Sequence, residues 1–253
     1  MPQAYEASGF HLRFDFNVEV KDTHFNLEVI SLEVVMTLFR LDASIRVDGS
    51  HSRALGDLVE HEWTQTHPGD QVLRRHLGTD PVPATAWAEA VAGAYLPADR
   101  RSEAQREAAA LAAGLVDELV AADALLFAVP LYNFGVSQHF KTYVDLVVTD
   151  PRMAAGQASA IAGKPAVLAT VRGGAYGAGT PREGWDHATP WMRRILEDVW
   201  GLDLRAVEEE FALVGVNPAL DQFADLAEVV RADAAALATE HGRSLAAALR
   251  RAA

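Results

Sequence analysis

An uninterrupted run of apolar residues in the middle of the chain stops at a proline and gives way to aromatic, amide and glycine residues. Residues 125–129 are Leu, Leu, Phe, Ala and Val, and Pro130 follows them. Such a run predicts a central strand of a parallel sheet that helices cover on both faces. Ligands of open α/β sheets bind beyond the carboxyl ends of these strands. Residues 130–137 are therefore expected to bind a flat ring rich in heteroatoms, and Ser137 to cap a helix beginning near Gln138.

From residue 36 onward, strand-like and helix-like segments alternate, as in an α/β fold. The expected strands cover residues 37–42, 71–76, 125–129, 165–171 and 204–214. The expected helices cover residues 52–65, 101–122, 138–148, 188–200 and 221 to the end, with Gly242 as a possible break. Residues 78–99 are expected to form a long connection. Right-handed crossovers between five parallel strands give a doubly wound sheet of the flavodoxin type.

The first 35 residues follow a different pattern. Apolar and polar residues alternate strictly over residues 10–20, and the alternation resumes at Phe25 after a short polar stretch. This pattern predicts a β-hairpin with one apolar face, which cannot stand alone in water. The hairpin is expected to pack on the main body or on a partner subunit, unless natural translation begins at Met36 and omits it. We therefore divide the chain into an extension, residues 1–35, and a ligand-binding domain, residues 36–253.

Composition excludes several classes of function. The formal net charge of −13 and the sequence pI near 5.1 argue against a surface for nucleic acid or anionic membrane, since either would need a basic patch. The chain contains no cysteine, so disulfides, thiolate catalysis and iron–sulfur clusters are excluded. It shows no secretory signal pattern and no apolar stretch of roughly 18 residues. Cytoplasm is the expected compartment.

Three loops of unusual composition are expected to meet at one edge of the sheet, after the first, third and fourth strands. The first, residues 44–52, holds three serines and leads into a helix N-terminus, where hydroxyl and N–H groups can bind phosphate. The alternative for this loop is a polar turn that caps the helix. It matches neither the Walker motif nor the dinucleotide fingerprint, so ATP and a Rossmann-bound dinucleotide are not expected.

The second loop is the one that begins at Pro130, and the third covers residues 170–177. In the third loop Gly173 and Gly174 allow the backbone to approach a ligand closely, although an ordinary flexible turn would have the same composition. Because the three positions are geometrically coupled, we expect the loops to surround one ligand.

The motifs in these loops resemble one known family. Residues 130–134 with Ser137, Gln138 and Lys141, followed by Gly163-Lys164 and Arg172-Gly173-Gly174, resemble the FMN-dependent NADH-azoreductases. These are also known as NADH:quinone oxidoreductases of the flavodoxin-like superfamily, and the resemblance runs from about Met36 to the C-terminus. It implies FMN as cofactor, NADH or NADPH as electron donor, and a quinone, azo compound or related conjugated molecule as acceptor. It also implies a homodimer with active sites at the subunit interface.

The resemblance further implies positions around the cofactor. The phosphate of FMN would be held by Ser44, Ser50, His51 and Ser52. The ribityl chain and ring would be bordered by Pro130, Leu131, Tyr132, Asn133 and Phe134. The polar edge of the ring would be lined by Val171, Arg172, Gly173 and Gly174.

Three features depart from the family pattern. Residues 149–153 replace a segment that usually borders the substrate, so the substrate side of the flavin is expected to be rebuilt. Tyr176 stands where a histidine often follows the Arg-Gly-Gly motif. No counterpart of the first 35 residues is identified in the family. Flavin binding is therefore more firmly expected than azo-dye reduction.

The expected mechanism is a ping-pong transfer of two electrons through the flavin. Backbone N–H groups at Asn133 and at Gly173-Gly174 would stabilise negative charge on the ring. Tyr176 would either donate a proton to product or act only as a lid contact. His51 is more typical of a helix-capping region than of a metal site, and no metal is expected.

Two rival functions remain open at this point. One is a flavodoxin-like electron carrier or flavin-binding regulator that does not itself oxidise nicotinamide. The other is an interaction module in which the N-terminal hairpin matters and the flavin site has decayed. Neither the physiological acceptor nor the choice between NADH and NADPH follows from the residues.

Overall fold

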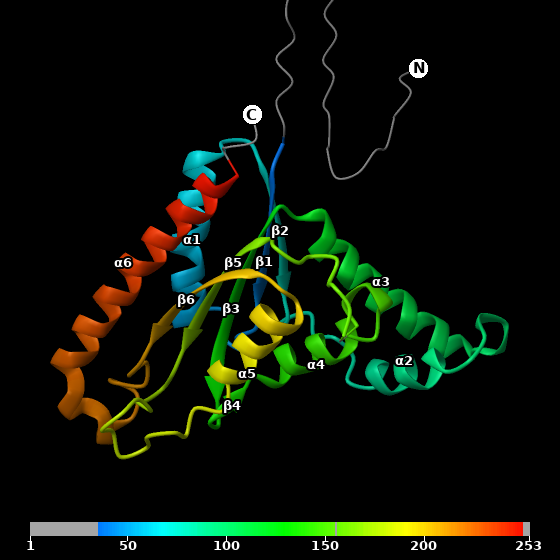
Figure 1. The fold of residues 1–253 in the computed structure, drawn as a ribbon. Coiled ribbons are helices and arrows are strands. Elements are labelled where there is room, and N and C mark those ends of the chain that lie inside the picture. Colours follow the sequence, from blue (N-terminus) through cyan, green and yellow to red (C-terminus); the bar gives the residue numbers. More distant parts are fainter. Residues whose placement is uncertain (1–34, 155, 250–253) are drawn as a thin grey trace, which may run out of the picture.

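Five parallel strands in the order β2-β1-β3-β5-β6 organise the protein, as the computed structural model shows (Figure 1). The structure describes residues 35–154 and 156–249, so the expected hairpin in residues 10–29 lies outside the described residues. The five-stranded, doubly wound prediction is confirmed. A sixth strand of two residues pairs antiparallel with the end of β3. The strands are β1 (Thr37–Asp42), β2 (Gln71–His76), β3 (Ala124–Tyr132), β4 (Gly135–Val136), β5 (Pro165–Val171) and β6 (Asp203–Glu209).

The central strand β3 runs two residues beyond Pro130, where the sequence had suggested that it ends. Its pairing with β1 stops at Ala128, which accepts a hydrogen bond from Ala43 N, whereas its pairing with β5 continues to Pro130 opposite Val171. Since alternate residues of a strand direct their N–H groups to the same side, the missing N–H of Pro130 faces the side on which β1 has already ended. The proline therefore costs no ladder hydrogen bond.

Helices cover both faces of the sheet (Figure 1). Helices α1 and α6 pack on one face, α3, α4 and α5 lie on the other, and α2 packs against the outer side of α3. Helix α2 lies within the segment expected to be an irregular connection, because its alanine-rich stretch packs on α3. The helices are α1 (His51–Thr66), α2 (Ala86–Ala94), α3 (Glu103–Ala121), α4 (Gln138–Val147), α5 (Thr189–Arg193), continued as a π-helix over Arg194–Val199, and α6 (Ala224–Ala248).

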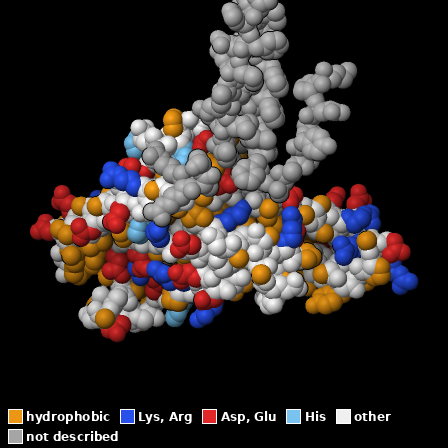
Figure 2. Space-filling model, turned by 45° about the horizontal axis from the view of Figure 1, so that its top comes forward, with side chains coloured by type: hydrophobic (Ala, Val, Ile, Leu, Met, Phe, Trp, Pro, Cys, Tyr) orange, Lys and Arg blue, Asp and Glu red, His pale blue; other side chains and the backbone are white. Residues whose placement is uncertain are grey.

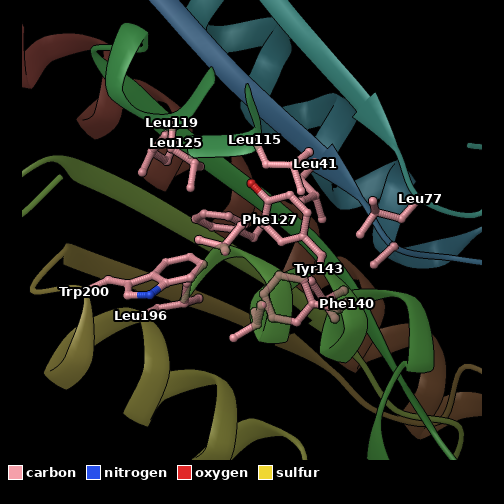
Figure 3. Packing of buried hydrophobic residues seen from close by; sticks show 14 of the residues in the cluster. Leu41, Leu77, Leu115, Leu119, Leu125, Phe127, Phe140, Tyr143, Leu196 and Trp200 are labelled. Atoms are coloured by element: carbon pink, nitrogen blue, oxygen red, sulfur yellow. The ribbon is translucent and has the colours of Figure 1, made fainter. Parts of the chain in front are cut away.

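Aromatic side chains fill the core between the sheet and helices α4 and α5 (Figure 3). Phe127 of β3 packs with its ring centroid 6.1 Å from that of Phe140 in α4 and 6.4 Å from that of Trp200. All three side chains are fully buried. Burial of side chains of this size contributes about 1.5–3 kcal/mol each, so the apolar run of β3 is fixed in place by the helices that follow it.

Buried Arg40 in β1 ties helix α1 to the sheet. Its guanidinium lies 3.1 Å from Asp42, 2.6 Å from Asp57 and 3.1 Å from Glu60, the last two on α1. Burial lowers the pKa of Arg40, but the neighbouring carboxylates outweigh burial and the net pKa is raised. The charged network therefore fixes α1, whose first turn lies at the carboxyl edge of the sheet.

Gly242 is a packing position and not a helix break. Helix α6 is continuous through it, and a Cβ at this position would lie 2.9 Å from the carbonyl oxygen of Val59 in α1. The close approach of the two helices thus requires a residue without a side chain, which local sequence does not reveal.

Acidic and basic side chains are interspersed over the face of the molecule seen in Figure 2. Among the described residues, no helix combines the length and apolar character needed to span a membrane.

Candidate functional site

A cleft of about 400 Å³ opens at the carboxyl ends of β1, β3 and β5, where the three unusual loops meet. Its volume falls within the range of roughly 300–1,000 Å³ that is typical of small-molecule sites. The residues that line it are Ser44, Ile45, Arg46, Gly49, Ser50, His51, Ser52, Pro130, Leu131, Tyr132, Asn133, Phe134, Val171, Gly173, Tyr176, Arg182, Ala212 and Leu213.

Serine hydroxyls and the first turn of α1 form one end of the cleft. The Ser50 side chain accepts a hydrogen bond from Arg53 N and caps the helix, and its oxygen lies 3.3 Å from the Ser52 hydroxyl. The Ser44 hydroxyl accepts a bond from Arg46 N and lies 3.2 Å from the hydroxyl of Tyr132. The prediction that this loop caps the helix is therefore confirmed. The same geometry places hydroxyl groups at the positive end of the helix.

His51, the first residue of α1, is tied to the end of β6. Its Nδ1 lies 2.6 Å from Oε1 of Glu209, whose side chain is buried. The histidine side chain thus anchors the start of α1, and the part of His51 best placed to face a phosphate is its backbone at the helix N-terminus.

A tight turn with a strained backbone joins β3 to β4. Tyr132 pairs with Gly135 across the turn, and both central residues, Asn133 and Phe134, have positive φ angles, 48° and 66°. A two-residue loop with two positive φ angles corresponds to the type I′ hairpin, which normally places glycine where Phe134 stands. A bulky residue in this conformation is an outlier of the kind that occurs at ligand sites.

Surrounding groups hold Phe134 in this conformation. Its carbonyl accepts a hydrogen bond from His187 N, and its ring makes edge contacts with Tyr176 and Trp185 at centroid distances of 5.9 and 5.2 Å. The guanidinium carbon of Arg182 lies 5.5 Å from the Phe134 centroid and 5.9 Å from the Trp185 centroid. The loop after β5 therefore closes over the turn after β3.

The loop after β5 is fastened to the end of β6 by an arginine network. The Arg172 guanidinium forms an ion pair with Glu208. Its nitrogens also lie 2.8 Å from a carboxylate oxygen of Asp186 and 3.7 Å from one of Glu210. Burial raises the pKa of Asp186, but hydrogen bonds from Thr189 and from Ala188 N, together with Arg172, outweigh it and leave the pKa below its ordinary value. Arg172 thus positions the loop through carboxylates of this chain.

The structure brings together nearly all of the residues predicted for the site. Ser44, Ser50, His51 and Ser52, the segment from Pro130 to Phe134, Val171, Gly173 and Tyr176 all line the cleft. Arg172 and Gly174 do not line it, and the Arg172 side chain is committed to the network above. Of the segment after α4, none of the described residues 149–163 lines the cleft of its own chain, and Arg152 binds Asp117 and Ala113 O of α3 instead.

Several lining residues were not predicted. Arg46 could have been predicted from the sequence, because it places a positive charge inside the serine-rich loop where a phosphate is expected. Ala212 and Leu213 were assigned to the last strand, but that strand ends at Glu209 and Phe211 turns the chain with a φ of 62°. Ala212 N then bonds to Arg172 O and Leu213 N to Gly173 O.

Gly78, which lies far from the serine-rich loop (residues 44–52) in sequence, packs against it. A Cβ on Gly78 would lie 2.1 Å from the carbonyl oxygen of Ser44, so the chain after β2 approaches the loop as closely as a backbone can. Nothing local distinguishes Gly78 from other loop glycines, because the requirement comes from this tertiary contact. Within the described part of the chain, no group of three or more histidine, aspartate or glutamate side chains is arranged to hold a metal ion.

Known proteins are similar to this chain in sequence. Two curated relatives, each named FMN-dependent NADH:quinone oxidoreductase, come from Frankia casuarinae and Frankia alni. The first is 36% identical over 203 residues, which cover 79% of this chain and 96% of the relative. The second is 37% identical over 197 residues, which cover 77% and 93% of the two chains.

Solved structures agree with the fold. The azoreductase AzrA superposes with a TM-score of 0.67 at 21% identity, covering 82% of this chain and 99% of that protein. An FMN-dependent NADH-azoreductase of Bacillus anthracis, solved in complex with FMN, superposes with a TM-score of 0.60 at 14% identity, covering 81% and 99%. The family model for the flavodoxin-like fold matches residues 36–232. The chain therefore belongs to the flavodoxin-like family that includes the FMN-dependent NADH:quinone oxidoreductases.

Proposed function

We propose that this protein is an FMN-dependent oxidoreductase that passes two electrons from NADH to a quinone, an azo compound or a related conjugated acceptor. The main support for the proposal is the composition of the cleft. The serine-capped N-terminus of α1 and the strained turn at Asn133 and Phe134 both line it. The Frankia relatives named above support the choice of FMN, NADH and quinone.

The residues present fit FMN. The phosphate needs several donors, and Ser44, Ser50 and Ser52 supply hydroxyl groups beside the first turn of α1. Arg46 adds a positive charge at the same end. The ring needs an apolar wall, and Leu131, Val171 and Ala212 are among the lining side chains that provide it.

FMN supplies the two-electron chemistry when it is bound, and the residues of the chain supply position and electrostatics. Backbone N–H groups of Asn133 and Gly173, which line the cleft, would donate to the polar edge of the ring. Arg172 would act indirectly, by holding the loop that carries Gly173. Tyr176, which is buried beside Phe134, would hold a proton near the product. A ping-pong order follows if donor and acceptor occupy the same open face of the cleft in turn.

Anaerobic spectroscopy tests the proposed function. The purified protein, after incubation with FMN, is expected to retain a yellow flavin absorption through gel filtration, and NADH without oxygen should bleach it. Addition of menadione should then restore the absorption. Protein that cannot be loaded with FMN would contradict the proposal. Protein whose flavin is reduced by a reductase protein but not by NADH or NADPH would instead be an electron carrier.

Gly78→Ala is expected to weaken FMN binding, because the added Cβ must displace the Ser44 backbone. We expect the Kd for FMN to rise by about tenfold or more, which corresponds to about 1.4 kcal/mol or more of binding free energy. Quenching of FMN fluorescence measures the Kd, and circular dichroism confirms the fold. Gly114→Ala is the matched control, since a Cβ on this α3 residue has open space around it. An unchanged Kd in folded Gly78→Ala protein would contradict the assignment of the serine loop.

We also propose that the protein is a homodimer in which the cleft lies at the subunit interface. Exposed apolar side chains at the rim of the cleft, Ile45 and Leu213, with Val47 beside them, support this proposal because water-exposed apolar groups gather at interfaces. Residues 149–153 do not line the cleft, which leaves its substrate side open to residues of a partner subunit. Sedimentation equilibrium at micromolar concentration should give twice the chain mass of 27.3 kDa. A mass of one chain would contradict it.

A further inference from the structure

Basic side chains line the cleft, although the chain as a whole carries a formal charge of −13. Its charged lining residues are Arg46 and Arg182, and none of the described residues that line it is an aspartate or a glutamate. The two arginines belong to different walls. Arg46 lies in the serine loop before α1, and Arg182 lies in the loop after β5.

The proposed cofactor accounts for only one of these charges. The phosphate belongs at the serine-rich end, where Arg46, the serine hydroxyls and the helix N-terminus converge. Arg182 instead contacts the aromatic turn, with its guanidinium carbon 5.5 Å from the Phe134 centroid and 5.9 Å from the Trp185 centroid. Arg182 is exposed, so its positive charge beside the ring site is open to a negative group of a bound molecule.

Among the described residues, no carboxylate neutralises Arg182. Within residues 35–154 and 156–249, no acidic oxygen lies within ion-pair distance of its guanidinium. The adjacent Glu183 is engaged elsewhere, because its carboxylate accepts a hydrogen bond from Gly179 N. Cation–π contacts with two rings hold the guanidinium while its N–H groups stay available, which suits recognition of a carboxylate or sulfonate.

We propose that Arg182, held on Phe134 and Trp185, is a specificity-determining residue that selects planar aromatic acceptors bearing an anionic group. This inference rests on the proposed function, since it names the substrate class of the same cleft. The ring of Phe134, which lines the cleft, contacts the flat body of the acceptor, and Arg182 pairs with its carboxylate or sulfonate. The electron donor also carries negative phosphates, so the test must separate donor from acceptor.

Stopped-flow measurements on the FMN-loaded protein make this separation, because each half-reaction is followed alone. The reduced protein is mixed with naphthoquinone sulfonate or with neutral menadione, which share a ring system, and the oxidised protein is mixed with NADH. Arg182→Gln is expected to slow reoxidation by the sulfonate by about tenfold or more. Reoxidation by menadione and reduction by NADH should stay within about twofold of wild type. Arg100→Gln, the same change on the exposed turn after α2, should alter none of these rates.

Binding of a redox-inert probe gives a readout that does not depend on turnover. Calorimetry should show that Arg182→Gln weakens binding of naphthalene sulfonate by about tenfold or more and leaves binding of neutral naphthol within about twofold. This measurement decides the inference even if the wild-type protein fails to oxidise NADH, in which case the proposed function alone is wrong.

Three outcomes would overturn the inference. Equal losses with both quinones would show that Arg182 only supports the packing of Phe134. If Arg182→Gln kept the wild-type rates and affinities for the sulfonates, the charge of Arg182 would play no part in binding the acceptor. A loss confined to reduction by NADH would assign the charge to the phosphates of the donor.

Discussion

The pairing of β3 with strands on both sides is the constraint on which the site depends. Because β3 is in register with β1 through Ala128 and with β5 through Pro130, the loops that follow these three strands must leave the sheet at one edge. The missing N–H of Pro130 faces the side where β1 has ended, so the strand can continue to Tyr132 and deliver its turn into the cleft. The ligand site is thus a consequence of strand length and register.

The strained turn is stable because contacts from distant parts of the chain hold it. Phe134 keeps a positive φ angle while its carbonyl and its ring are engaged by the loop after β5. That loop is in turn fastened to β6 through Arg172 and its carboxylates. A conformation that costs of order 1–3 kcal/mol by itself persists only where the surroundings determine it in this way. Arg182 of the same loop lies against the Phe134 ring and lines the cleft.

Local sequence was sufficient to predict features that depend on local chemistry, such as the capping role of Ser137, the bounds of β2 and β5, and the apolar run of β3. It also identified the loops that meet at the cleft, because the edge of a doubly wound sheet is fixed by topology. It could not reveal that Gly78 touches Ser44, that Arg172 is committed to carboxylates, or that the last strand ends at Glu209. Those facts depend on contacts between residues far apart in the chain, which composition and periodicity do not encode.

Hydrogen exchange measured by mass spectrometry, with and without FMN, tests the central claim most directly. The account predicts that FMN slows amide exchange in residues 44–53, in residues 130–137 and in residues 171–176, where backbone N–H groups face the proposed cofactor. Exchange in α2 and α3, which lie away from the cleft, should stay unchanged. Protection confined to other parts of the chain, or equal exchange in the presence of saturating FMN, would contradict the account.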